Sequence, residues 1–248
     1  MAWIGQNQGN PARAQTFPGA RVSSTGADEA ARAFLQRVYL FMSLGLAVTG
    51  LVALGVVSSP AALAFIFGNP IVFFGLMIAE LLLVMVFAPV AARASAGVAA
   101  AMFFGYAALS GVTFSAIFLR YTMGSIGSTF VITGGMFAAL SGYGAVTKRD
   151  LSSLGSFCFM GLVGLVIASV VNAFLGSSML YWLTTFVGVI VFTGLTAYDT
   201  ARLKALGAEI DGGEARTKGA LQGALILYLD FINLFLMLLR VLGGRRRD

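Results

Sequence analysis

Long stretches without a charged residue constrain this chain more than any other feature. Four runs of 42, 26, 27 and 48 residues contain no Asp, Glu, Lys or Arg, and they lie at 38–79, 94–119, 121–147 and 151–198. A helix needs roughly 20 apolar residues to cross a bilayer core about 30 Å thick. Each run can therefore cross a membrane, and the two longest must fold back and cross twice.

The composition excludes a water-soluble globular domain. Hydrophobic residues make up 58% of the 248 residues and charged residues only 10%, whereas soluble domains carry roughly a quarter of charged residues. Histidine is absent and Cys158 is the single cysteine. These absences exclude histidine-liganded metals, Ser-His or Cys-His catalytic pairs and an intramolecular disulfide. We expect no cofactor, and titrating chemistry is left to carboxylates.

The pattern predicts an all-α integral membrane protein with seven transmembrane helices. Candidate turns at 58–60, 68–70 and 176–178 divide the two longest runs. The predicted spans are about 38–57, 71–90, 98–119, 127–146, 154–175, 180–201 and 219–242. Residues 61–67 are too few to cross and are expected at the interface. The 31 glycines indicate close packing between helices.

Three regions follow from this division of the chain. Residues 1–33 are polar and are expected to form a disordered cytoplasmic tail, because they contain no long apolar segment. Residues 34–243 form the seven-helix transmembrane domain. Residues 244–248 form a basic C-terminal tail.

The distribution of Lys and Arg predicts a cytoplasmic N-terminus. The tail and loops on the N-terminal side carry 11 such residues, whereas the opposite loops hold only Arg120. The net charge of +6 largely reflects this asymmetry, so the expected partner is the lipid bilayer and not nucleic acid. The basic end at 245–247 conflicts with an external C-terminus. Either the C-terminus is external despite its charge, or the last segment enters the membrane and returns to the same side. We expect seven crossings.

Three acidic residues fall within or at the edge of the predicted spans: Glu80, Asp199 and Asp230. A charge near mid-bilayer costs about 2.5 to 3.5 kcal/mol on insertion scales, so such residues face protein or water. Around the last helix, Asn233 and Arg240 lie within about 80° of Asp230 and form one polar stripe. Asp230 could instead make only a buried hydrogen bond, and Asp199 could be a simple interfacial charge.

Two carboxyl groups held within hydrogen-bonding distance cannot both ionise at low cost, so they share a proton. Loss of that proton leaves two negative charges that repel each other and attract a cation. Oxygen ligands suit a hard cation such as Ca²⁺. In a chain without histidine, such a pair is the most plausible pH sensor.

Three segments resemble the Bax-inhibitor-1 family, also called the transmembrane Bax inhibitor motif family, in its bacterial inner-membrane form. They are Thr193-Gly194-Leu195-Thr196-Ala197-Tyr198-Asp199-Thr200, Leu227-Tyr228-Leu229-Asp230-Phe231-Ile232-Asn233-Leu234-Phe235 and Thr147-Lys148-Arg149-Asp150-Leu151-Ser152. With the seven apolar segments, the resemblance covers about residues 30–245.

The resemblance implies a seventh helix surrounded by the other six. It also implies a pH-sensitive leak of cations, notably calcium, gated by an aspartate pair that maps onto Asp199 and Asp230. In family members studied as channels, an arginine near the end of span two latches this pair. Here alanines replace the basic run of such members, and Arg93 is the one arginine available.

The leading hypothesis is therefore a calcium leak pathway with Asp199 and Asp230 as pH sensor and as a transient calcium site. Glu80, Asn233, Arg93 and Arg240 are the predicted pathway or supporting residues. The alternative is a non-conducting regulator that binds membrane proteins, such as a membrane protease. An intramembrane aspartyl protease is disfavoured, because the presenilin-type Gly-x-Gly-Asp motif is absent before Asp230. We expect no enzymatic activity.

Overall fold

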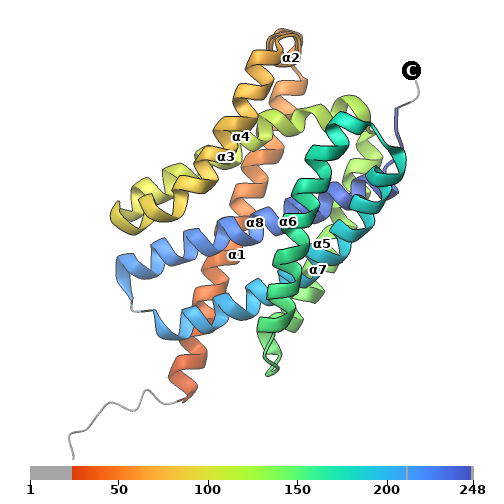
Figure 1. Ribbon diagram of the computed structural model, residues 1–248. Coiled ribbons are helices and arrows are strands. Elements are labelled where there is room, and N and C mark those ends of the chain that lie inside the picture. Colours follow the sequence, from red (N-terminus) through yellow and green to blue (C-terminus); the bar gives the residue numbers. More distant parts are fainter. Residues whose placement is uncertain (1–23, 211, 247–248) are drawn as a thin grey trace, which may run out of the picture.

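The structure is a computed structural model that describes residues 24–210 and 212–246 (Figure 1). These residues form eight α-helices, with no strand beyond one isolated bridge. The helices are α1 (Ser24–Val57), α2 (Pro60–Phe67), α3 (Pro70–Arg93), α4 (Ala96–Arg120), α5 (Met123–Val146), α6 (Ser152–Leu175), α7 (Ser178–Glu209) and α8 (Gly213–Leu242).

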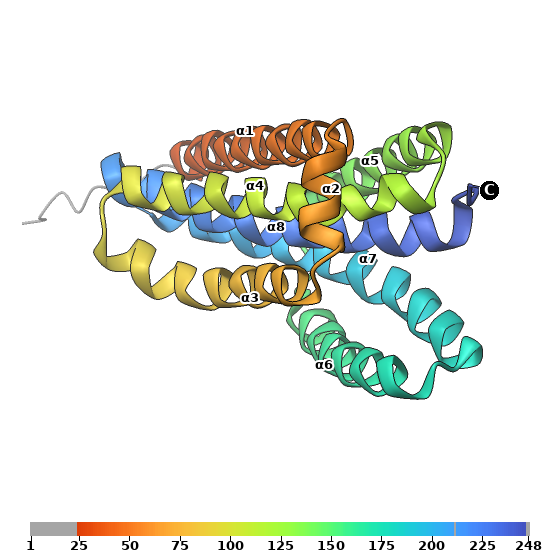
Figure 2. The ribbon, with the colours of Figure 1, turned by 90° about the horizontal axis from the view of Figure 1, so that it is seen from above.

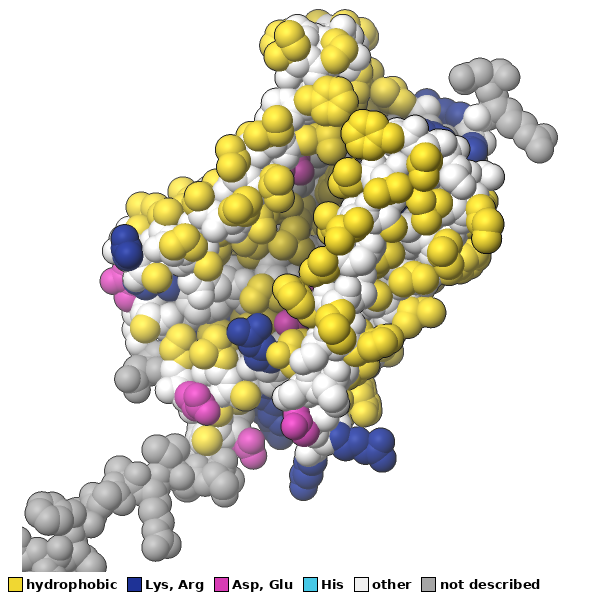
Figure 3. Space-filling view, viewed as in Figure 1, with side chains coloured by type: hydrophobic (Ala, Val, Ile, Leu, Met, Phe, Trp, Pro, Cys, Tyr) yellow, Lys and Arg dark blue, Asp and Glu magenta, His cyan; other side chains and the backbone are white. Residues whose placement is uncertain are grey.

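Seven of the eight helices are long and apolar enough to cross a membrane, and they occupy the seven predicted spans. The all-α membrane class is therefore confirmed. The short helix α2 has eight residues and occupies the segment predicted to be too short to cross. Side chains at the two ends of the bundle carry the charges, and hydrophobic side chains cover the surface between them (Figure 3).

Three helices extend well beyond their apolar segments. α1 begins at Ser24, α7 continues to Glu209 and α8 begins at Gly213. Hydropathy marks only the part of a helix that meets lipid, whereas Ala, Glu, Lys and Arg also favour helix in water. Residues 24–33 are consequently helical, and the expected disordered tail otherwise falls on residues 1–23, outside the described residues.

Local sequence signals set most helix ends. A Ser, Thr or Asn side chain accepts a hydrogen bond from a first-turn N–H at the start of five helices; these residues are Ser59, Asn69, Ser95, Thr122 and Ser177. Pro60 and Pro70 occupy first positions, where no amide hydrogen is needed. Gly176 ends α6 in the left-handed region, at φ 62°.

Helix α8 is the most buried of the long helices. It packs on α1, α3, α4, α5 and α7, whereas α6 packs chiefly on α7. Figure 2 shows α6 and the first half of α7 diverging from the other helices. The expectation that the last helix is surrounded by all six others is therefore not confirmed.

Helix α8 ends at the opposite end of the bundle from the start of α1 (Figure 1). α8 is one unbroken helix of 30 residues, so the last segment does not enter and return. Beyond it, the chain pairs with the α4–α5 loop. The Thr122 N–H donates to the Gly244 carbonyl at 3.1 Å, and the Arg246 N–H donates to the Arg120 carbonyl at 3.1 Å.

A buried hydrogen-bond cluster joins α1, α4 and α8. The Thr49 hydroxyl oxygen lies 2.7 Å from the Tyr228 hydroxyl and 2.8 Å from the Ala107 carbonyl oxygen. Tyr228 is completely buried. Gly111 lets α4 approach this point, because a Cβ there would lie 2.6 Å from the Thr49 carbonyl oxygen. The cluster fixes the position of α8 against its neighbours.

We expect Thr49→Val to lower the free energy of unfolding by about 1 kcal/mol, since it removes the hydrogen bond to Tyr228 at nearly constant volume. Thermal unfolding in detergent measures the change. Thr133→Val is the matched control, because the buried Thr133 hydroxyl bonds only to Thr129 within its own helix. Equal losses in both variants would contradict a special role for the cluster.

Candidate functional site

A cavity of about 560 Å³ lies among α6, α7 and α8. Its wall is largely apolar, with Phe159 and Met160 from α6 and Phe192 from α7. Five polar or charged side chains interrupt this wall toward α7 and α8: Tyr198, Asp199, Arg202, Asp230 and Asn233. The structure therefore brings Asp199 and Asp230 to one place, although they lie 31 positions apart in the chain.

Close packing against α5 and α6 positions Asp199. A Cβ at Gly144 of α5 would clash with the Ala197 carbonyl, and one at Gly155 of α6 would clash with the Tyr198 ring. Glycine at both positions lets the two helices approach α7. Because α7 continues to Glu209, Asp199 lies well inside the helix and not at its end. It can therefore reach the depth of Asp230.

Asp230 is buried, with 5% of its surface exposed, and is more buried than Asp199. It follows Tyr228 by two positions, so the α1–α4–α8 hydrogen-bond cluster sets its height. No N–H or O–H donor of the described residues reaches its Oδ2 atom. Its carboxyl group lines the same cavity as the Asp199 carboxyl and lies close enough to interact with it electrostatically. A carboxyl pair without another donor needs a shared proton.

Few other titratable groups face the pair. Arg202 of α7 lies close enough to attract the Asp199 carboxylate, and Cys158 approaches it from α6. Tyr198 completes the lining on α7. On the α5 side the neighbouring contact is uncharged, since Ser141 hydrogen-bonds Thr200 at 3.1 Å. Arg202 thus supplies one positive charge beside two carboxyl groups. This charge would balance a pair that carries one proton and one negative charge.

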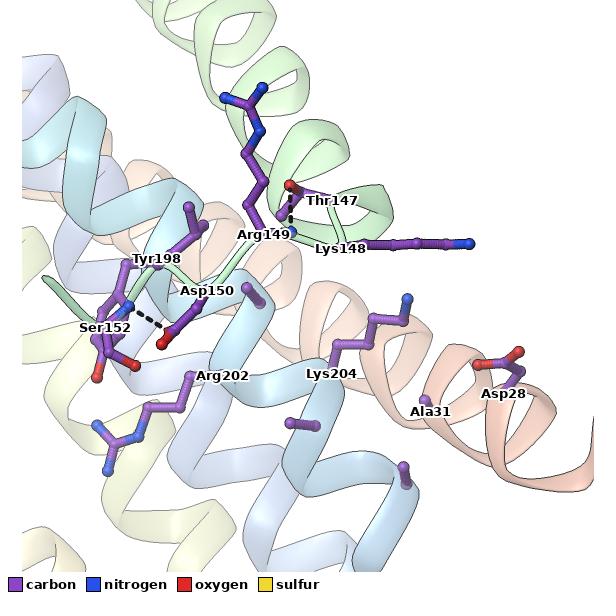
Figure 4. A pocket seen from close by; sticks show the side chains of 14 residues that line it. Asp28, Ala31, Thr147, Lys148, Arg149, Asp150, Ser152, Tyr198, Arg202 and Lys204 are labelled. Atoms are coloured by element: carbon purple, nitrogen blue, oxygen red, sulfur yellow. Dashed lines mark hydrogen bonds between the residues drawn. The ribbon is translucent and has the colours of Figure 1, made fainter. Parts of the chain in front are cut away.

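A second cavity, of about 530 Å³, adjoins the first at the N-terminal end of the bundle (Figure 4). Tyr198 and Arg202 line both cavities. Lys148, Arg149 and Lys204 add positive charge to the second one. We call the first cavity, which Asp199 and Asp230 line, the aspartate cavity, and the second the vestibule. The vestibule is basic and lies next to the aspartate cavity.

The vestibule includes the loop that the family-like motif 147–152 forms. Hydrogen bonds from the side chain and the backbone N–H of Ser152 hold the pKa of Asp150 below its usual value. The hydrogen bond from the Ser152 backbone N–H to Asp150 Oδ1 is 2.8 Å long. Asp150 therefore stays ionised at neutral pH and offsets part of the vestibule's positive charge.

The remaining predicted site residues lie apart from the pair. The Glu80 carboxylate accepts a 2.7 Å hydrogen bond from the Thr113 hydroxyl, between α3 and α4. Arg93 is exposed at the end of α3, and Arg240 lies near the other end of α8. None of these three lines the aspartate cavity. Asn233 does, while its amide donates to the Leu229 carbonyl at 2.8 Å.

Sequence reasoning missed Arg202 as a site residue. It was counted among the loop cations, because span six was expected to end near residue 201. Residues three apart lie on the same face of a helix. Because α7 continues to Glu209, the spacing of Asp199 and Arg202 indicates that the two side chains are neighbours. In the position expected for a latching arginine on α3, Arg93 does not reach the pair.

The described residues contain no group of three or more His, Cys, Asp or Glu that could hold a metal ion. Ca²⁺ takes 6 to 8 oxygen ligands in a closed site. Two carboxylates and the Asn233 amide cannot supply that number without water.

Comparisons with known proteins find similarity along most of the chain. The sequence model described as "Inhibitor of apoptosis-promoting Bax1" matches residues 31–247. The inner membrane protein YbhL of Escherichia coli is 50% identical over 215 residues, which cover 86% of this chain and 92% of YbhL. A protein of Caulobacter vibrioides is 37% identical over 252 residues, covering 97% of this chain and 99% of the relative.

We expect Asp230→Asn to reduce the loss of thermal stability on raising the pH from about 5 to about 9. In the unchanged chain, alkali places two like charges in one buried cavity, whereas the amide keeps the shape and donates to Asp199. Melting temperature across this pH range measures the effect. The exposed Glu29→Gln should behave as the unchanged chain, and parallel curves for all three proteins would contradict a shared proton.

Proposed function

The chain belongs to the Bax inhibitor-1 family, and on that premise we propose that it is a pH-sensitive cation leak channel of the inner membrane. Calcium is the proposed ion. The observation that carries the proposal is the pair of buried carboxyl groups, Asp199 and Asp230, which line one cavity where no N–H or O–H donor of the described residues reaches Asp230 Oδ2. The proposed function is not enzymatic.

In the closed state, a proton shared between the pair holds α7 and α8 together. The proton makes the pair a monoanion, and the neighbouring Arg202 stabilises its remaining charge. When the proton leaves, two carboxylates face each other in an apolar surrounding and repel. The repulsion favours separation of the two helices, and the exposed oxygens attract a cation in place of the proton.

The surroundings of the pair support a route for the ion. A hollow runs between α3 and α6, and acidic side chains are visible inside it (Figure 3). On the N-terminal side, the aspartate cavity adjoins the vestibule of Figure 4 through Tyr198 and Arg202. We place Glu80 along this route and Asn233 beside the pair, with the N-terminal side in the cytoplasm according to the distribution of Lys and Arg.

The direct test is calcium flux into liposomes that contain only the purified protein. Flux should increase as the pH rises from about 6 to about 8, because the pair loses its shared proton. Asp230→Asn and Asp199→Asn should each remove most of this pH dependence. Glu29→Gln, which removes an exposed carboxylate at the start of α1 that lines neither cavity, should retain it.

Two results would sink the proposal. One is a pH response in Asp230→Asn that equals that of the unchanged chain. The other is the absence of calcium flux at every pH from protein that is folded and inserted. The second result would favour a non-conducting regulator that acts by binding other membrane proteins, such as a membrane protease.

A further inference from the structure

A third cavity lies at the C-terminal end of the bundle, away from the aspartate pair. It measures about 580 Å³ and three arginines line it: Arg120, Arg240 and Arg245. None of its lining residues is an aspartate or a glutamate. A cavity with three guanidinium groups and no carboxylate in its described wall has the charge of an anion site.

The tertiary structure gathers these arginines from three segments. Arg120 ends α4, Arg240 lies in the last turn of α8 and Arg245 belongs to the tail beyond it. The tail is held in place by the pairing of Tyr121 with Arg245 and by the Gly244 N–H, which donates to Ser125 Oγ at 2.8 Å. The cavity is therefore a built feature of the fold.

Arg240 is held over an aromatic ring. Its guanidinium carbon lies 5.3 Å from the centre of the Tyr181 ring, a cation–π contact. Its recorded hydrogen bond goes to the Met237 sulfur at 3.8 Å, a weak acceptor. Arg240 is thus positioned, but its donors lack a strong acceptor among the described residues.

The rim of the cavity is apolar on the side of α6 and α7. Phe174, Leu175 and Met179 flank the lining residues Gly176 and Ser178 and are 87%, 68% and 81% exposed. Trp182 also lines the cavity, and tryptophan favours the boundary between lipid and water. A basic cavity with an apolar rim at the end of a membrane helix suits a ligand with an anionic head and acyl chains.

These arginines also account for the charge anomaly of the sequence. The end of the bundle that carries Arg120, Arg240 and Arg245 is opposite the end with most Lys and Arg, so the distribution rule disfavours basic residues there. An anion bound between them would neutralise part of their charge. The N-terminus of α7, at Ser178, lies in the same cavity and adds a partial positive charge.

We propose that this cavity binds the phosphate group of an anionic phospholipid in the adjoining leaflet. Arginine binds phosphate through paired N–H groups, and the apolar rim contacts the acyl chains. Free phosphate shares the head chemistry but leaves the rim without a partner. The site is independent of the proposed conduction, since none of its residues lines the aspartate cavity.

The test uses the purified full-length chain in detergent, titrated with dihexanoyl phosphatidylglycerol, with dihexanoyl phosphatidylcholine and with inorganic phosphate. Equilibrium binding and the shift in melting temperature are the readouts. Phosphatidylglycerol should bind tightest. Arg120→Gln with Arg245→Gln should weaken its binding roughly 25-fold, at about fivefold for each arginine near a membrane surface.

Two further variants keep the test specific. Arg246→Gln removes a charge from the same tail without touching the lining, and it should change the affinity less than about twofold. Arg120→Lys with Arg245→Lys keeps the charge and should restore part of the binding. All substituted arginines are exposed, so the variants should fold, and circular dichroism with size-exclusion chromatography checks this.

Selective binding of phosphatidylglycerol that the double glutamine variant loses and Arg246→Gln retains supports the proposal. Three results would overturn it. Inorganic phosphate could bind as tightly as the lipid, which would make the acyl chains irrelevant. The double glutamine variant could bind phosphatidylglycerol as well as the unchanged chain does. Arg246→Gln could lose as much affinity as the double variant, which would show diffuse attraction to the tail.

Discussion

The hydrogen bond between Thr49 and Tyr228 is the contact on which the arrangement of this bundle depends. Lipid offers helices no hydrophobic reason to associate, so close packing and a few hydrogen bonds must hold them. The Thr49 hydroxyl bridges α1, α4 and α8 at 2.7 and 2.8 Å, and Gly111 allows the approach. Because Asp230 follows Tyr228 by two positions, this contact also sets where the Asp230 carboxyl lies.

The two ends of the bundle have different chemistry, and α8 connects them. Ten residues, or about 15 Å of helix, separate Asp230 from Arg240. Asp230 belongs to a buried carboxyl pair that one arginine, Arg202, faces. Arg240 belongs to an arginine cavity with an apolar rim. In our proposals, one helix thus carries a proton-sharing site near its middle and a lipid-binding site in its last turn.

Much of the fold followed from the charge-free runs, since a bilayer imposes helix length directly. Individual residues show where this reasoning stopped. The end of α7 was placed near residue 201, because hydropathy does not follow a helix into water, and Arg202 was therefore missed. Arg93 was expected beside the pair on the strength of its position after span two, but the end of α3 lies elsewhere. Which helices surround α8 also depends on how the helices pack against one another, and no local sequence pattern predicts that packing.

The sequence by itself determined the solvent, the seven spans and the identity of the buried acids, because each is a property of single residues or of one helix. Only the tertiary structure decided which of these groups meet. Asp199 and Asp230 share a cavity because Gly144 and Gly155 let α5 and α6 pack closely on α7. Arg120, Arg240 and Arg245 share another because the tail pairs with the α4–α5 loop. Both sites join residues that are distant in the chain. Tertiary contacts, and not any local sequence pattern, bring these residues together.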